Sequence, residues 1–214
     1  MQSISLTHML PTVFSGLGEV KSDIWQQDVT FERGKLYLVE AASGTGKSSL
    51  CSYILGYRND YEGQLHFDDR DARSLSIPEW VDLRKHSVSI LFQELRLFPE
   101  LTALENVQIK NALTGHKNQA EIQEWFERLG IADKTNTPVR FMSFGQQQRV
   151  AMIRALVCPF DFLLADEPIS HLDDTNAAIM ADIMLTEAHK QGAGVIVTSI
   201  GKHMNLSYDH IFKL

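Results

Sequence analysis

The fold of this chain is decided by residues 35–48, Lys35-Leu36-Tyr37-Leu38-Val39-Glu40-Ala41-Ala42-Ser43-Gly44-Thr45-Gly46-Lys47-Ser48. The apolar run over 35–40 has the length and composition of a buried strand. Small residues follow it, and then a segment of helical length, Lys47 to Tyr57. A loop between a strand and a helix lies at the helix N-terminus, where backbone N–H groups and the helix dipole favour an anion.

The spacing of Gly46, Lys47 and Ser48 matches the pattern G-x-x-x-x-G-K-[ST] of a phosphate-binding loop. The first glycine of that pattern is Ala41 here, which fits only if its φ stays negative or some strain is accepted. Glu40 just before it must point away from a phosphate. The alternative to a phosphate-binding loop is a strand–helix turn that binds no ligand. The residues predicted to bind the phosphates are Ser43, Gly44, Thr45, Gly46, Lys47, Ser48 and Ser49.

A second apolar run, Phe162 to Ala165, is followed directly by Asp166 and Glu167. A carboxylate at the end of a strand can hold Mg²⁺, and a second can accept a hydrogen bond from an attacking water. We therefore predict Asp166 as a metal ligand and Glu167 as the general base. Two surface acids at the end of a strand are the alternative interpretation.

Composition excludes several classes of protein. The chain has 214 residues, with 20 basic and 27 acidic residues and a net charge of −7. This acidic balance argues against a nucleic-acid partner, which requires phosphate neutralisation. Two cysteines without metal-ligand spacing favour buried thiols in a reducing compartment. No window approaches the about 18 apolar residues of a membrane-spanning helix.

Patterning along the chain predicts an α/β fold with a helical insertion. Strands are expected over 3–6, 28–31, 35–40, 62–67, 87–92, 160–165, 194–198 and 210–214. Helices are expected over 47–57, 103–113, 119–129, 145–157 and 174–190. Strands alternating with helices imply a parallel sheet. We predict one domain over 1–214, with an α/β core and an N-terminal antiparallel β subdomain over about 1–95 and 158–214, and a helical subdomain over about 96–157.

The segment Met142-Ser143-Phe144-Gly145-Gln146-Gln147-Gln148-Arg149 introduces a family resemblance. It resembles the Leu-Ser-Gly-Gly-Gln signature of ATP-binding cassette (ABC) ATPases, with substitutions at Met142 and Phe144. Gln93 stands where that family keeps its Q-loop glutamine, and Ser170-His171-Leu172-Asp173 resembles its D-loop. Residues 97–107 are similar to the lipoprotein-release and macrolide-export branch.

The resemblance implies a P-loop NTPase fold, ATP and Mg²⁺ as ligands, and a head-to-tail dimer of two cassettes. Ser48, Gln93 and Asp166 would hold Mg²⁺, and Gln93 would also sense the attacking water. The signature would act on the nucleotide of the partner, and Asp173 would couple the two sites. The signature residues concerned are Ser143, Gly145 and Gln146.

The same resemblance implies an ATP-hydrolysing subunit that powers a separate transmembrane permease from the cytoplasmic side of the inner membrane. The dimer partner is a second ABC ATPase, identical or different. No transported substrate follows from the sequence.

Departures from the family pattern predict slow turnover. Ser199 stands where the family has its switch histidine, and it cannot carry the positive charge of an imidazole. We list Ser199 as a catalytic residue, with His203 or His171 as possible substitutes for that histidine. Phe14, or else Trp25, is the aromatic expected to stack on adenine. A degenerate regulatory subunit that binds nucleotide with little hydrolysis is the alternative function.

Overall fold

The computed structural model describes residues 1–16, 20–42, 44–201 and 203–214. Its central sheet has five strands in the order β6-β7-β8-β3-β9, and every pairing is parallel. The strands are β3 Leu36–Glu40, β6 Val88–Leu91, β7 Phe162–Asp166, β8 Gly194–Ser199 and β9 His210–Lys213. The four strands β3, β6, β7 and β8 are apolar because both faces of the sheet are covered.

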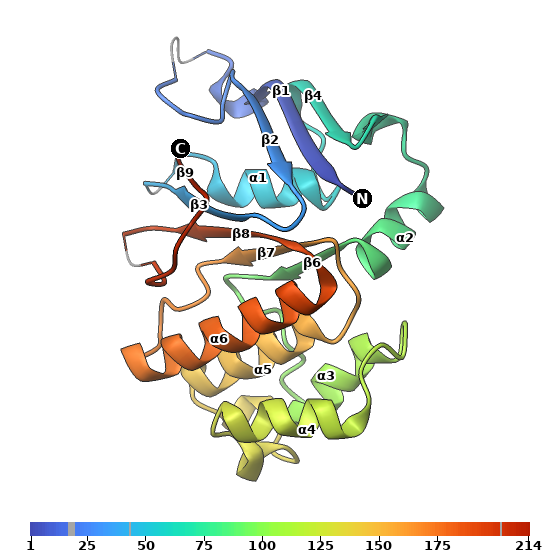
Figure 1. The fold of residues 1–214 in the computed structure, drawn as a ribbon, viewed down its shortest axis with the longest axis vertical. Coiled ribbons are helices and arrows are strands. Elements are labelled where there is room, and N and C mark those ends of the chain that lie inside the picture. Colours follow the sequence, from blue (N-terminus) through green and yellow to red (C-terminus); the bar gives the residue numbers. More distant parts are fainter. Residues whose placement is uncertain (17–19, 43, 202) are drawn as a thin grey trace.

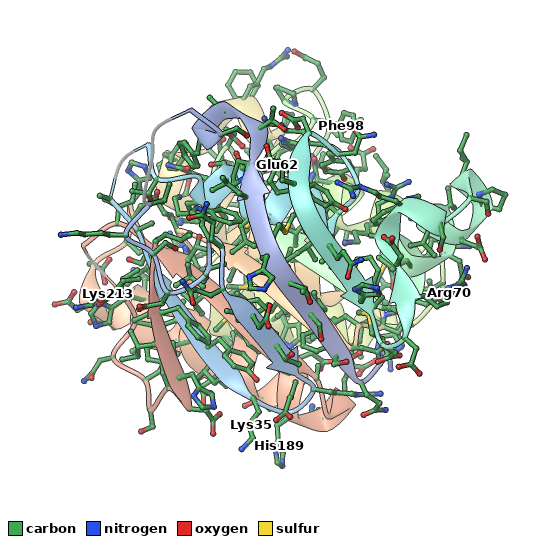
Figure 2. All side chains as sticks on the ribbon, turned by 90° about the horizontal axis from the view of Figure 1, so that it is seen from above. Lys35, Glu62, Arg70, Phe98, His189 and Lys213 are labelled. Carbon is green, nitrogen blue, oxygen red and sulfur yellow. The ribbon has the colours of Figure 1, made fainter. Side chains whose placement is uncertain are left out.

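A second sheet is antiparallel and has the order β2-β1-β4-β5. Its strands are β1 Ser3–Pro11, β2 Asp28–Glu32, β4 Tyr61–Phe67 and β5 Arg70–Asp71. Helix α1 (Lys47–Ile54) lies between the two sheets (Figure 1). Seen from above, Arg70 of the antiparallel sheet and Lys213 of β9 lie on opposite sides of the molecule (Figure 2).

The remaining helices cover the other face and one side of the central sheet (Figure 1). They are α2 Ile77–His86, α3 Ala103–Asn111, α4 Gln119–Arg128, α5 Phe144–Leu156 and α6 Asp174–Gln191. Helices α3, α4 and α5 follow one another between β6 and β7. The capping boxes Thr102/Glu105 and Asn118/Glu121 fix where α3 and α4 begin, because each gives hydrogen-bond partners to two backbone N–H groups that would otherwise lack them.

The core consists of two apolar clusters separated by the central sheet. Leu163 of β7 packs in the cluster that contains α5 and α6, whereas Leu164 packs in the cluster with α1 and the antiparallel sheet. Successive strand residues point to opposite faces, so a continuous apolar strand serves both clusters. This arrangement holds the carboxyl ends of β3, β6, β7 and β8 rigidly at one edge.

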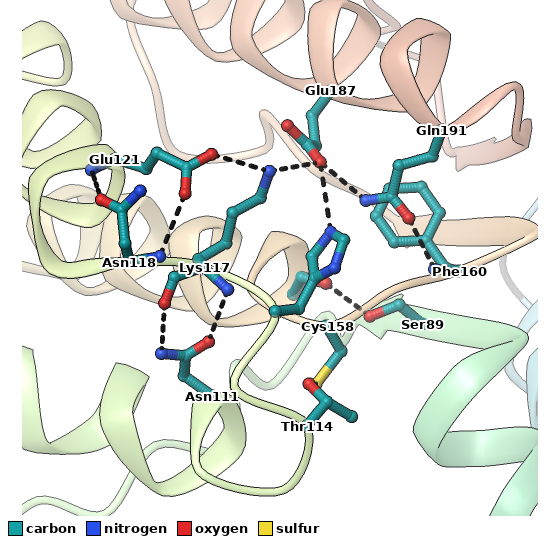
Figure 3. Close-up of polar contacts among 12 residues, drawn as sticks. Ser89, Asn111, Thr114, Lys117, Asn118, Glu121, Cys158, Phe160, Glu187 and Gln191 are labelled. Atoms are coloured by element: carbon teal, nitrogen blue, oxygen red, sulfur yellow. Dashed lines mark hydrogen bonds and ion pairs between the residues drawn. The ribbon is translucent and has the colours of Figure 1, made fainter.

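A buried polar cluster joins the segment after α3 to α6 (Figure 3). The Lys117 ammonium lies 2.9 Å from Glu187 Oε1 and 3.3 Å from Glu121 Oε1. Gln191 Nε2 also donates to Glu187 Oε1, at 2.7 Å. The side chain of Asn111 accepts from the Lys117 backbone N–H and donates to its carbonyl. The cluster therefore fastens the helical insertion to the longest helix of the core.

Most expected elements occur close to their predicted bounds. Strand β1, however, extends to Pro11, five residues beyond the expected 3–6, and the two-residue strand β5 was not predicted. The helix expected over 47–57 ends at Ile54, because Gly56 adopts a left-handed conformation with φ 67°. Helix α2 was not predicted, although its capping box Ser76/Glu79 is visible in the sequence. In the part of the chain that the structure describes, no helix is long and apolar enough to cross a bilayer.

Candidate active site

The site lies at the edge where β3, β6, β7 and β8 end. The phosphate-loop segment follows β3, and Gln93 lies after β6. Asp166 ends β7 with Glu167 directly after it, and Ser199 ends β8. Parallel strands that end together bring residues far apart in sequence into contact. The structure thus places Lys47, Gln93, Asp166 and Glu167 side by side, as the sequence predicts.

Lys47 is the centre of this group. Its ammonium donates to Asp166 Oδ1 at 2.8 Å, to Glu167 Oε1 at 2.5 Å and to Gln93 Oε1 at 3.3 Å. The side chain is only 5 % exposed. Burial alone would lower the pKa of Lys47, but the hydrogen bonds that it donates to Asp166 and Glu167 and the negative charges of these carboxylates outweigh burial, and the pKa is raised. Lys47 is a cation at neutral pH.

Asp166 is held from a second side by Thr198 of β8, whose hydroxyl donates to Asp166 Oδ1 at 2.5 Å. Both residues are buried. Ser199 follows Thr198 and is also buried, and its carbonyl accepts from the Ala41 backbone N–H at 2.9 Å. Ser199 therefore lies beside the start of the phosphate-loop segment.

Glycine is required at Gly46, the N-cap of α1. Its φ is 97°, and a Cβ there would meet the Phe14 ring at 3.0 Å and the Trp25 ring at 3.1 Å. Gly44 is also left-handed, with φ 86°. Backbone N–H groups can approach an anion closely only where side chains are absent. Ser43, predicted for the same loop, lies outside the described residues.

The two candidate adenine-stacking aromatics differ in position. Trp25 is fully buried beneath the loop, and its indole N–H donates to the Thr45 carbonyl at 2.8 Å. The fallback choice of Trp25 for stacking is therefore wrong, because its ring faces are covered by protein. Phe14 lies over Gly46 and is partly buried. Its stacking role stays a prediction.

Ala41 and Glu40, the two unusual residues at the start of the phosphate-loop pattern, are both compatible with the structure. Ala41 is not among the described residues with positive φ, so its methyl group is compatible with the backbone. Glu40 Oε1 lies 3.9 Å from His203 Nδ1. Glu40 therefore faces His203 in the segment after β8. His203 is exposed.

The signature and D-loop residues form helix caps. Ser143 is the N-cap of α5, where its hydroxyl accepts from Gln146 N and its own N–H donates to Gln146 Oε1. Asp173 is the N-cap of α6, and hydrogen bonds from Asn176 lower the pKa of its carboxyl. Among the described residues, no hydrogen bond or ion pair joins Ser143, Gly145 or Asp173 to Lys47.

Phe144 replaces a signature glycine, and the structure shows where its ring goes. The ring packs edge-on against the His171 imidazole, with centroids 4.3 Å apart, and remains 44 % exposed. His171 belongs to the D-loop, so this contact joins the signature to the D-loop within one chain.

The residues at this edge fit a magnesium nucleotide. Among the described residues, no group of three or more His, Cys, Asp or Glu side chains could hold a metal alone. Mg²⁺, however, binds through one or two carboxylates together with phosphates and water. Asp166 supplies a carboxylate, and the left-handed glycines beside Lys47 supply an open cradle.

Sequence reasoning missed three residues that support the site: Trp25 as a support of the loop, Thr198 as a partner of Asp166, and Gln148. The Gln148 side chain is 2 % exposed and donates to the carbonyls of Pro168 at 2.7 Å and Glu167 at 3.3 Å. The run Gln146-Gln147-Gln148 was the available signal, because a buried glutamine needs partners.

Comparison with known proteins agrees with this geometry. Residues 25–170 match the family model "ABC transporter". The chain is 32 % identical to the "Uncharacterized ABC transporter ATP-binding protein YclH" of Bacillus subtilis, over 80 % of this chain and 76 % of that protein. It is 34 % identical to "Macrolide export ATP-binding/permease protein MacB 2" of Aeromonas hydrophila, over 87 % of this chain but only 29 % of that protein.

Solved structures of ABC transporter cassettes also resemble this chain. The chain superposes on the "Dimeric Structure of MJ0796, a Bacterial ABC Transporter Cassette" with a TM-score of 0.78 and 26 % identity, over 92 % of this chain and 87 % of that chain. Another structure of MJ0796 is described as a dimeric post-hydrolysis state bound to ADP and Pi, and matches with a TM-score of 0.74.

The chain belongs to the ABC transporter family. It is an ABC ATPase cassette, with the P-loop NTPase fold that the sequence predicts. The match confirms the predicted function as an ATP-hydrolysing cassette that dimerises and powers a transmembrane partner, and the predicted similarity to the macrolide-export type.

Proposed function

We propose that Glu167 is the general base for ATP hydrolysis in this cassette, with the polyphosphate on the loop 43–49. The observation that carries this proposal is the contact of Lys47 with Asp166 and Glu167 at one sheet edge. A phosphate held by Lys47 is then next to both carboxylates. Glu167 accepts a proton from the water that attacks the γ-phosphorus, the bond to the β-phosphate oxygen breaks, and ADP and phosphate leave.

Phosphate binding and base activation are linked through Lys47. The Lys47 ammonium pairs with Glu167 Oε1. A γ-phosphate that takes Lys47 as its partner competes with this ion pair and releases the Glu167 carboxylate. Binding of the substrate therefore makes the base available for water.

Magnesium would be held by Ser48, Gln93 and Asp166. When bound, it would neutralise charge on the phosphates. Gln93 Oε1 already lies 3.3 Å from the Lys47 ammonium, at the centre of this group. The backbone at Gly44, Thr45 and Gly46 would bind the phosphates, and Phe14 would stack on the adenine.

Ser143, Gly145 and Gln146 act on the nucleotide of a second cassette, and Asp173 links the two sites. What supports this is that Ser143 begins α5 and Asp173 begins α6, so both present helix N-termini on the exposed surface. The second cassette is a copy of this chain or a different one. The membrane partner places the dimer on the cytoplasmic side of the membrane.

The domain division supports the same proposal. The core, over about 1–95 and 158–214, carries the nucleotide, and the helical part, over about 96–157, carries the signature. Turnover is slow, because Ser199 supplies no cationic donor at the γ-phosphate. Such a loss costs on the order of a few kcal/mol in barrier, or about two orders of magnitude in rate.

The experiment is ATP hydrolysis by Glu167→Gln, with Glu124→Gln on the exposed face of α4 as the matched control. We expect Glu167→Gln to lose about 100-fold or more in rate and to accumulate an ATP-dependent dimer in sedimentation. Glu124→Gln should behave as wild type. A Glu167→Gln rate within twofold of wild type would refute the assignment of the base.

A regulatory cassette is the second candidate, and the observation that favours it is Ser199 at the end of β8. It predicts an ATP-dependent dimer in wild type with no phosphate release above the Glu167→Gln rate.

A further inference from the structure

The turn that carries Glu167 is held in an unfavourable backbone conformation. Glu167 has φ 48°, a left-handed value that non-glycine residues adopt only at a cost. Such residues persist where their surroundings fix them in place. The Glu167 backbone N–H is held by the Thr198 carbonyl at 3.0 Å. Its carbonyl accepts from the Ser170 backbone N–H at 3.4 Å and from the Ser170 hydroxyl at 3.3 Å, both within the turn. The carbonyl of Pro168 takes its donor from another element.

Gln148 of α5 supplies that donor. Its Nε2 lies 2.7 Å from Pro168 O and 3.3 Å from Glu167 O. Two carbonyl oxygens face the amide, so the amide nitrogen must point toward them. The amide oxygen is buried and has no partner among the described residues.

The neighbouring glutamines of α5 have different partners. Gln146 completes the capping box with Ser143, and Gln147 donates to the carbonyls of Val139 and Met142, before the helix. Only Gln148 of the three reaches the turn after β7. A single helix thus begins at the signature and, less than two turns later, holds the turn of Glu167.

The same helix holds the turn that follows Gln93. Leu95 and Arg96 are left-handed, with φ 59° and 50°. The guanidinium of Arg154, further along α5, donates to both of their carbonyls. Both strained turns next to the predicted catalytic side chains therefore depend on side chains of α5.

We propose that Gln148 is a positioning residue for Glu167, and that through it α5 connects the signature, which acts on the partner's ATP, to the general base of its own chain. The inference rests on the proposed role of Glu167. Gln148 touches neither substrate nor reacting atoms. Without its donor the turn relaxes, and the Glu167 carboxylate leaves its place while the phosphate loop keeps its own.

The test compares Gln148→Met with Gln191→Met in steady-state ATP hydrolysis, with melting temperatures measured in parallel. Methionine has a similar volume and no N–H donor. Gln191 also makes two hydrogen bonds, to Glu187 and from Phe160, but lies away from the site. We expect Gln148→Met to lose roughly tenfold or more in kcat, with KM for ATP and ATP-dependent dimerisation within twofold of wild type. Gln191→Met should lower the melting temperature and leave kcat within twofold.

A kcat for Gln148→Met within twofold of wild type would overturn the proposal. So would a loss of kcat that Gln191→Met reproduces at an equal loss of melting temperature. If Glu167→Gln also hydrolyses ATP normally, the proposed function fails. If Glu167→Gln is inactive and Gln148→Met is normal, only the positioning role fails.

If Gln148→Met does not fold, the variant Gln148→Glu tests the same proposal. Gln148→Glu keeps the shape and can donate to Pro168 O only while its carboxyl is protonated. We expect its kcat, relative to wild type, to fall as the pH rises from about 6 to about 9. A ratio that stays near one across this range would contradict the proposal.

Discussion

Trp25 illustrates how a residue's role depends on what surrounds it. An aromatic upstream of a phosphate loop suggests stacking on a base, but the Trp25 ring is covered and its N–H holds the Thr45 carbonyl. The ring also lies where a Cβ on Gly46 would be. We therefore expect Trp25 to affect nucleotide binding only through the shape of the loop.

We predict that Trp25→Phe lowers ATP affinity about threefold to tenfold and the free energy of unfolding by about 1–2 kcal/mol, because it removes a buried donor and part of a ring. Calorimetric titration and denaturant unfolding measure these two quantities. Trp80→Phe, a partly buried tryptophan packed on Phe67, is the control and should change stability alone. Equal affinity in wild type and Trp25→Phe would contradict the role.

The contacts of Lys47 show what the sequence reveals at this scale and what it does not. The pattern around Lys47 and the two acids at the end of β7 predict that these residues share a site. The reason is that phosphate and magnesium binding together require a lysine and carboxylates. The hydrogen bonds of Thr198 and Gln148 are not predictable in this way. Each joins residues far apart in the chain, and threonine or glutamine has many other possible partners.

At the scale of elements, α2 is the helix that the sequence analysis overlooked. Its apolar residues are exposed or partly buried, so the periodic pattern that reveals most helices is weak. Capping chemistry marks its start instead. Glu79 accepts from the Ser76 backbone N–H and hydroxyl and from Arg70.

The α2 cap predicts an acid-sensitive term in stability. Hydrogen bonds from Ser76, and then from Arg70, lower the pKa of Glu79 from 4.5 to about 2. A lowered folded-state pKa stabilises the fold above the unfolded value, and this stabilisation is lost as the pH falls from 4.5 toward 2. In urea unfolding, wild type should exceed Glu79→Gln in stability at about pH 6, by a margin that shrinks below about pH 4. A margin independent of pH would count against the prediction.

The cluster in Figure 3 is the second feature at this scale, because it connects the helical insertion to α6. Lys117 is 8 % exposed and Glu187 is 1 % exposed. Removing one partner of a buried pair leaves the other charge without compensation.

We predict that Lys117→Met lowers the free energy of unfolding by about 3 kcal/mol, and that the double variant with Glu187→Met recovers much of this loss. Lys134→Met, which breaks an exposed pair with Asp133, should cost no more than about 1 kcal/mol. Chemical denaturation of wild type, Lys117→Met, Glu187→Met and the double variant measures the coupling. Additive losses in the double variant would show that the pair is not coupled.

For the whole molecule, the order of motifs along the chain was sufficient to predict the fold. The sequence begins its core with an apolar strand, a glycine loop and a helix, and then alternates further strands with helices. This order allows few arrangements other than a parallel sheet with its loops at one edge. The division into core and helical parts stays a prediction. The contacts between these parts, such as Lys117 with Glu187, arise from packing that no local pattern encodes.

The central claim is that the loop around Lys47 binds the polyphosphate of ATP, and calorimetric titration with Mg-ATP tests it most directly. We expect saturable binding to wild type and an affinity at least about tenfold lower for Lys47→Met, with circular dichroism showing that the variant is folded. No heat from folded wild type, or equal affinity in both proteins, would contradict it.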